Sequence, residues 1–164
     1  MDPVFTIIVN FTTSIGVEVA STSLFSEPTF LPGIKIDEGK IKIDPEKLTY
    51  IGDLLHEVGH IAVSDEHERN SLNEEKINSS KMREAEEMMA IAWSYAACLH
   101  LNIDPKIVFH KDGYQGGGDV IVENFNEGRY FGVPMLAYYG MTIEPKPKEK
   151  ISDFHFPKMI RWLR

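Results

Sequence analysis

The chain of 164 residues contains a single cysteine, Cys98. An internal disulfide is therefore excluded, and the small secreted folds that depend on disulfides are excluded with it. Cys98 lies in an apolar, alanine-rich stretch without a basic neighbour, which predicts a small buried side chain and not a nucleophile. Cysteine usage thus favours a reducing compartment.

Basic residues are also scarce. Lys and Arg number 17 against 25 Asp and Glu, which gives a formal net charge of −8 at pH 7. Binding to phosphate groups requires a basic surface, and this chain has an excess of acid. We therefore expect no nucleic-acid partner and no binding to an anionic membrane.

Long apolar runs are missing as well. No stretch approaches the roughly 20 apolar residues of a membrane span. The first ten residues lack a positively charged region, and their apolar run is too short for a signal peptide. These features predict a cytoplasmic protein. A chain with 43% hydrophobic and 26% charged residues suits one folded domain over 1–164.

Alternating apolar and polar residues predict a β-hairpin over residues 33–44, around a three-residue loop at 37–39 with Gly in the left-handed conformation. Residues 4–20 are rich in β-branched and aromatic types and fit a strand or a helix equally well. The Asp-Pro pair at 44–45 predicts a short turn. The next helix begins there or near Asp53, which would then be its N-cap.

The most informative stretch is residues 50–63, an apolar helical pattern that contains His-Glu-Val-Gly-His. His56 and His60 are four residues apart, so their imidazoles lie on one helix face and can bind one Zn²⁺. Glu57 lies beside such a metal, where it can act as general base on metal-bound water. Burying these three side chains without partners would cost several kcal/mol, and a metal removes that cost. We therefore predict a zinc site.

A second helix is predicted over residues 83–99, which are rich in Ala and Met and free of Gly and Pro. Helix N-termini favour acids in general, but phase separates the three glutamates at its start. At about 100° per residue, Glu87 begins an inward stripe. The stripe continues through Ile91, Ser94, Tyr95 and Cys98. Glu87 is the predicted third ligand, Glu84 the second choice and Glu86 the third.

The H-E-x-x-H motif followed by a Glu on a second Ala-rich helix resembles the gluzincins. The short spacing is similar to that of the small intracellular ImmA/IrrE-type metallopeptidases, over about residues 34–100. The resemblance implies an α+β, zincin-like fold, with zinc held by His56, His60 and Glu87 and with Glu57 as catalytic base. The Leu-Met-Pro pattern that ends this family's helix is absent, so the resemblance does not extend to repressor cleavage.

The whole chain also resembles a family of bacterial proteins of unknown substrate. The resembling stretches are residues 30–33, 52–57, 89–97 and 132–136. This second resemblance favours the same site and implies no target for it.

The polar residues 65–81 predict a solvated, mobile loop. His67 lies in this loop close to the motif. The longer metzincin motif, however, needs a Gly and a His at positions where Val63 and Glu66 stand. His67 is therefore expected to be an ordinary loop histidine.

Residues 109–118 form a Gly-rich loop without the Gly-Lys-Ser/Thr ending of a phosphate-binding loop, so no nucleotide site is expected. His110 and Tyr114 are candidates for a hydrogen-bond donor opposite the metal, or they pack or face solvent. Short helices are predicted after Asp119, as N-cap, and from Pro134.

The last 20 residues, 145–164, are predicted to be a linker over 145–150 and then a docking tail. The tail, 154–164, has an apolar side that is expected to pack on the body of the protein or on a second subunit, which would make a homo-oligomer.

The expected function is zinc-dependent hydrolysis of a peptide bond in a peptide or protein substrate, with Glu57 as general base. The alternative is a metal-binding regulatory or interaction domain that keeps the site and cleaves nothing. The hairpin before the motif either borders the cleft, where an extended peptide can add to it, or only covers the core.

Overall fold

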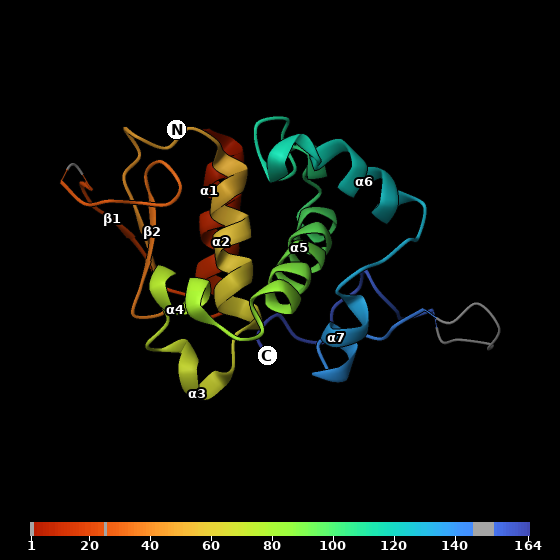
Figure 1. Ribbon diagram of the computed structural model, residues 1–164. Coiled ribbons are helices and arrows are strands. Elements are labelled where there is room, and N and C mark those ends of the chain that lie inside the picture. Colours follow the sequence, from red (N-terminus) through yellow and green to blue (C-terminus); the bar gives the residue numbers. More distant parts are fainter. Residues whose placement is uncertain (1, 25, 146–152) are drawn as a thin grey trace.

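The computed structural model describes residues 2–24, 26–145 and 153–164 (Figure 1). These residues form an α+β fold of seven α-helices, two short 3-10 helices and one three-stranded mixed sheet. The α-helices are α1 (Pro3–Ser14), α2 (Ile51–Val63), α3 (Glu66–Arg69), α4 (Glu74–Ser79), α5 (Arg83–His100), α6 (Gly118–Asn126) and α7 (Val133–Tyr138). The remaining elements are β1 (Val19–Ser21), β2 (Ile34–Asp37), β3 (Lys40–Ile43), η1 (Pro105–Ile107) and η2 (Tyr114–Gly116).

The sheet has the strand order β1-β3-β2, with β1 parallel and β2 antiparallel to the central strand. The predicted hairpin is confirmed, but its loop has two residues instead of three because Asp37 pairs with Lys40. Glu38 and Gly39 have φ values of 50° and 69°, as in the tight turns that match strand twist. The undecided segment 4–20 forms both a helix, α1, and the first strand, β1.

Helices α2 and α5 pack side by side at the centre of the molecule, with the sheet on the outer side of α2 (Figure 1). Gly59 permits the close approach, because a Cβ there would lie 3.1 Å from both the Ala90 carbonyl oxygen and Ser94 Oγ. In α5, all residues from 89 to 98 are buried. The predicted inward stripe was therefore too narrow, since partners surround α5 on every side.

Helix α2 begins at Ile51, with Tyr50 at the N-cap position and no side-chain cap. Asp53 is thus not the N-cap that the sequence suggested. It lies in the first turn of the helix and faces His110. The preceding residues 44–47 form the predicted turn, in which Asp44 accepts hydrogen bonds from the backbone N–H groups of Leu24 and Glu46.

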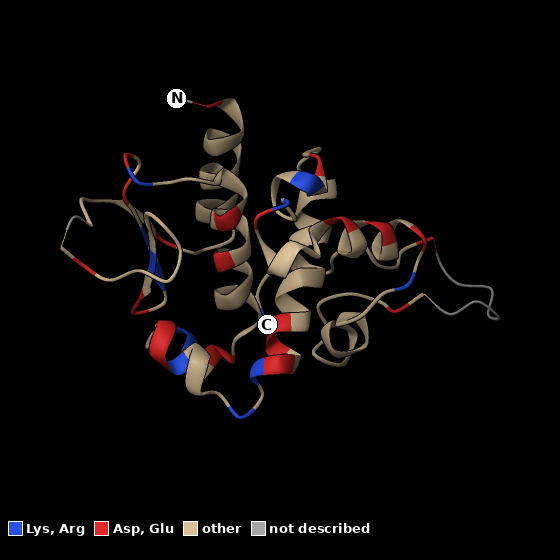
Figure 2. Cartoon of the chain, turned by 45° about the horizontal axis from the view of Figure 1, so that its top comes forward, with Lys and Arg blue, Asp and Glu red and all other residues tan. Residues whose placement is uncertain are grey.

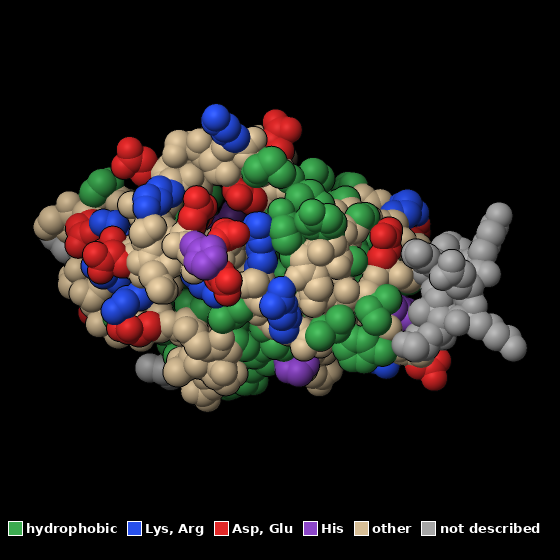
Figure 3. Space-filling model, turned by 90° about the horizontal axis from the view of Figure 1, so that it is seen from below, with side chains coloured by type: hydrophobic (Ala, Val, Ile, Leu, Met, Phe, Trp, Pro, Cys, Tyr) green, Lys and Arg blue, Asp and Glu red, His purple; other side chains and the backbone are tan. Residues whose placement is uncertain are grey.

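The segment 65–81, predicted as a loop, contains the helices α3 and α4. The side chains of Asp65 and Asn73 cap them by accepting hydrogen bonds from the backbone N–H groups two and three residues ahead. Leu72, between the two helices, is buried. The loop prediction was wrong because helices this short have no apolar period that a sequence pattern can reveal. Figure 3 shows charged side chains of both signs over this region and hydrophobic side chains towards α7.

The C-terminal third follows the predicted pattern with one correction. Helix α6 begins at Gly118, so Asp119 lies in its first turn and is not its cap. Pro134 lies in the first turn of α7, and Gly140, with a φ of 72°, follows the end of that helix. Among the described residues, no helix combines the length and apolar character needed to cross a bilayer.

The C-terminal tail docks on its own chain. The Trp93 indole N–H donates to the Trp162 carbonyl at 2.9 Å, and Phe156 is fully buried. The Arg164 backbone N–H donates to the Ala62 carbonyl at the end of α2. Assembly through the tail stays a prediction. Of the predicted linker 145–150, only the first residue lies among the described residues.

Gly52 offers a test of how α2 is seated. A Cβ at this position would collide with the backbone of Ile107 and Val108. We expect Gly52→Ala to lower the free energy of unfolding by about 1–3 kcal/mol, because the clash outweighs the better helix propensity of Ala. Urea denaturation measures the change. Val120→Ala, at a helical position 59% exposed, is the control and should change stability by less than about 0.5 kcal/mol.

Candidate metal centre

The structure brings the three predicted ligands together. The Nε2 atoms of His56 and His60, both on α2, lie 3.1 Å apart. Glu87, in the second turn of α5, places Oε1 at 3.3 Å from His56 Nε2 and Oε2 at 3.1 Å from His60 Nε2. The other two candidates lie elsewhere: Glu84 is exposed, and Glu86 lines a different cavity. Of the three glutamates, Glu87 alone closes the pair of imidazoles into a triad.

The spacing of these donor atoms can be compared with that of a metal site. Four ligands at 2.0–2.1 Å around a tetrahedral Zn²⁺ lie about 3.3 Å from one another. The observed separations of 3.1–3.3 Å fit that value, and the histidines also group with Glu57 as possible ligand atoms. One hydrogen bond is missing around the histidines, because His56 Nδ1 is buried without a partner among the described residues. Metal-bound histidines ordinarily donate that N–H.

The electrostatics of Glu87 depend on the two histidines. Burial alone raises the pKa of this carboxyl group, but the imidazoles of His56 and His60 outweigh burial and hold the pKa well below its ordinary value. The Glu87 side chain remains 41% exposed. The carboxylate is therefore ionised and accessible, as a ligand facing a cavity must be.

Glu57 has the opposite environment. It is only 9% exposed, and its carboxyl group has no hydrogen-bond or ion-pair partner among the described residues. Burial raises its pKa to about 7, against the opposing charge of His60. A carboxyl group with this pKa exchanges a proton near neutral pH, which is the property of an effective general base. Asp53 and Glu57 are the acidic residues of α2, and Figure 2 shows acidic residues in red on the helices at the centre of the molecule.

A second layer of side chains lies at the start of α2. His110 Nε2 is 2.9 Å from Asp53 Oδ1, and the ring of Tyr50 stacks on that of His110 with centroids 3.8 Å apart. The Tyr50 hydroxyl donates to Asp112. These contacts fix the loop that follows η1 against α2. His110 is not among the residues that line the cavity over the triad, so it positions Asp53 and the loop.

Tyr114 is the member of this loop that reaches the site. Its ring meets that of His56 edge to face at 5.5 Å and lines the cavity. Tyr114 and Gln115 have φ values of 53° and 55°, a conformation that costs non-glycine residues free energy and that clusters at functional sites. Burial raises the pKa of the Tyr114 hydroxyl well above its ordinary value, as do Glu87 and Asp53, so it stays a donor.

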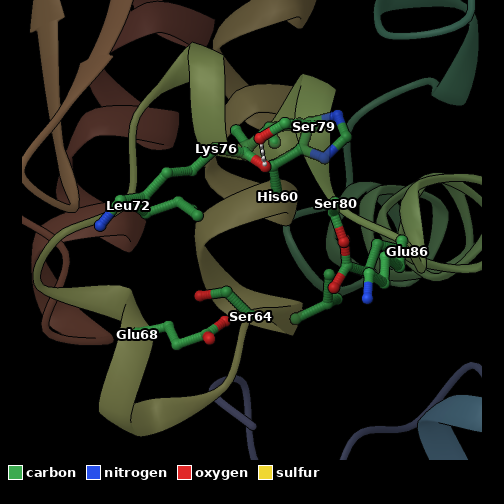
Figure 4. Close-up of a pocket in the computed structure, with 11 residues that line it drawn as sticks. His60, Ser64, Glu68, Leu72, Lys76, Ser79, Ser80 and Glu86 are labelled. Atoms are coloured by element: carbon green, nitrogen blue, oxygen red, sulfur yellow. Dashed lines mark hydrogen bonds between the residues drawn. The ribbon is translucent and has the colours of Figure 1, made fainter.

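Two cavities flank the triad. The first, of about 440 Å³, contains the triad and Glu57. Its walls come from the residues before β2, from α4, from the start of α5 and from the loop 112–115. The second, of about 380 Å³, lies between α3, α4, the C-terminal end of α2 and the N-terminal end of α5 (Figure 4). His60 and Ile77 line both cavities. We call them the metal-side cavity and the outer cavity.

Some residues of the site were not recognised from the sequence. Asp53 has the sequence features of a helix cap. Glu74, Ile77 and Arg83, which line the metal-side cavity, carry no signal in the sequence because they lie on or beside the predicted loop 65–81. His67 was expected to be an ordinary histidine, and it lies at the surface, with its side chain 86% exposed beside Glu66.

The buried carboxyl group of Glu57 makes the stability of the metal-free protein depend on pH. Its pKa of about 7 lies above the ordinary 4.5, so folding favours the neutral form and the stability that it contributes falls as pH rises between these values. Glu57→Gln removes the penalty. With EDTA present, the variant should be more stable than wild type by about 3 kcal/mol at pH 8 and by far less at pH 5. Urea denaturation at both pH values measures this, and an equal difference at both would contradict it.

Comparison with known proteins gave no relative. No protein-family model matches the chain, and neither a curated protein nor a solved structure matches it. The resemblance to ImmA/IrrE-type metallopeptidases therefore remains a prediction.

Proposed function

We propose that the protein is a zinc-dependent peptidase of zincin type. One observation carries the proposal: His56, His60 and Glu87 converge within 3.1–3.3 Å, beside the buried and unpaired carboxyl group of Glu57. Two histidines, one carboxylate and an open fourth side form the ligand set of catalytic zinc sites. The small mixed sheet beside the motif helix and the glutamate-bearing second helix also favour a zincin-type fold.

In this proposal His56, His60 and Glu87 bind the ion, and Glu57 transfers the proton. Zinc bound there would supply a water molecule of lowered pKa and would polarise the carbonyl group of the substrate. Glu57 accepts a proton of the attacking water as the new C–O bond forms, and then donates it to the leaving amine nitrogen as the peptide C–N bond breaks. In the metal-free protein, burial raises the pKa of Glu57 to about 7.

Tyr114 is the hydrogen-bond donor for the negative charge that develops on the substrate oxygen. Its hydroxyl group remains protonated, and its ring is held against His56. A positioned donor in a cavity with little water stabilises such a charge far better than water does. Of the two donors suggested by the sequence, Tyr114 lines the metal-side cavity. His110 does not line it but pairs with Asp53, which does.

An extended peptide is the substrate shape that the site favours. Phe30 and Leu31 line the metal-side cavity, and a turn joins them to β2, where Leu31 bridges to Ile34. Among the described residues, β3 is the only strand that pairs with β2, which makes β2 an edge strand of the sheet, and the bridge to Leu31 occupies only its first residue. Edge strands bind extended peptides through backbone hydrogen bonds. A peptide that reaches the triad can therefore lie along this edge.

The metal assignment is tested by elemental analysis of protein purified without added metal. We expect about one zinc per chain in wild type and in Glu57→Gln, and almost none in the double variant His56→Ala/His60→Ala. Glu87→Ala should lower zinc affinity by at least tenfold. Glu84→Ala is the matched control, because Glu84 begins the same helix outside the site. Equal zinc in wild type and the double variant would refute the site.

Hydrolysis is tested with a peptide library, analysed by mass spectrometry. Wild-type protein should cleave a subset of peptides, and zinc-loaded Glu57→Gln should lose at least 100-fold in rate, because no group remains to move the proton. Cleavage by Glu57→Gln at the wild-type rate would contradict the proposed role. Zinc binding without any cleavage would leave a metal-binding domain that is not a peptidase.

A further inference from the structure

The metal-side cavity is strongly acidic. Its lining includes five carboxylates and, among the described residues, one cationic side chain, that of Arg83. The carboxylates are those of Asp53, Glu57, Glu74, Glu87 and Asp112. If all five carboxylates are ionised, Arg83 and a divalent cation on the triad together offset three of the five negative charges. The cavity would then keep a net charge of −2.

Three of these carboxylates have roles in the site already described. Glu87 contacts the two histidines, Glu57 is the general base, and Asp53 pairs with His110. The Glu57 carboxyl group is nine-tenths buried, has no hydrogen-bond or ion-pair partner among the described residues and lines the same cavity. The cavity therefore contains more negative charge than its own residues neutralise.

The other two carboxylates lie on different walls. Glu74 is on α4 and accepts a hydrogen bond from the Phe30 backbone N–H. Asp112 is on the loop before η2 and accepts a hydrogen bond from the Tyr50 hydroxyl. Within the described part of the chain, neither forms an ion pair with a Lys or Arg side chain. Both are fixed in place by neutral donors and remain available to a cationic ligand.

The outer cavity differs in this respect. Its charged lining residues, apart from His60, are two acids and two bases, Glu68, Glu86, Lys76 and Lys81. Charges of both signs therefore balance there, and the acidic imbalance of the metal-side cavity does not extend to its neighbour. A separate cavity beside α6 is also acidic, with Asp119, Glu123 and Glu127 against Lys106, but it lies outside the site.

We propose that the metal-side cavity selects substrates with a positive charge next to the bond to be cleaved, recognised by Glu74 and Asp112. The inference rests on the proposed peptidase function and names its substrate class. The charge is an ammonium or guanidinium group, from a Lys or Arg side chain or from a free amino terminus. Such a group is attracted by carboxylates that approach it from two walls of the cavity, Glu74 partly buried and Asp112 exposed.

Binding is measured separately from cleavage, with zinc-loaded Glu57→Gln as the receptor. The probes are fluorescent pools of eight-residue peptides with the central residue fixed as Lys, norleucine or Glu and the amino terminus acetylated. A fourth pool has norleucine and a free amino terminus, with the label at the carboxyl end of every peptide. We expect the Lys pool or the free-amine pool to bind at least tenfold more tightly than the acetylated norleucine pool, and the Glu pool to bind most weakly.

Substitution identifies the recognising groups. Adding both Glu74→Gln and Asp112→Asn to the Glu57→Gln receptor should reduce its preference for the charged over the neutral pool to less than about threefold. Adding Glu75→Gln instead should leave this preference unchanged. Glu75 is the matched control, because it adjoins Glu74 on α4 but is exposed and does not line the cavity. Circular dichroism and zinc content verify that each variant is folded and loaded. The preference should also weaken in 0.5 M salt.

The outcomes separate this inference from the proposed function. Tighter binding of the Lys pool assigns the recognised charge to a side chain, and tighter binding of the free-amine pool assigns it to the amino terminus. Equal binding of the charged and neutral pools, no binding of any pool, or a preference that survives both substitutions would overturn the inference. If wild-type protein cleaves nothing but Glu57→Gln still prefers cationic peptides through Glu74 and Asp112, the peptidase assignment fails and the charge selection stands.

Discussion

The close packing of α2 on α5 is the contact on which the rest of the structure depends. Gly59 lies between His56 and His60, on the turn that faces Ala90 and Ser94 of α5. Because it has no side chain, the helices approach far enough for Glu87 to lie within 3.3 Å of both imidazoles. The buried core of α5 begins two residues later, at Met89. The fold and the triad are therefore products of one interface.

The same interface explains why the site is electrostatically unusual. Burial raises the pKa of Glu57 to about 7, while the histidines lower the pKa of Glu87. Two carboxyl groups in one cavity thus differ in protonation through their surroundings alone. Such separation of pKa values is typical of sites in which one group binds and another transfers protons.

The sequence predicted those parts of the molecule that follow from local periodicity. The motif helix, the second helix and the hairpin have clear patterns, and the phase of α5 ranked Glu87 first. It did not predict pairings between distant segments. Asp53 has the local features of a helix cap, and its pairing with His110, 57 residues away, follows from tertiary packing alone. α4 was missed because a six-residue helix fixed by its Asn73 cap has no apolar period.

The position of Ile77 has a consequence for substrate length. This side chain and His60 line both cavities, so α4 separates the metal-side cavity from the outer cavity. A short peptide can occupy the metal-side cavity alone. A longer peptide that fills both cavities must pass Ile77. It must therefore lie beneath α4 or displace this helix, which has no buried residue. For the proposed peptidase, the free energy needed to move α4 would then be added only for substrates that fill both cavities.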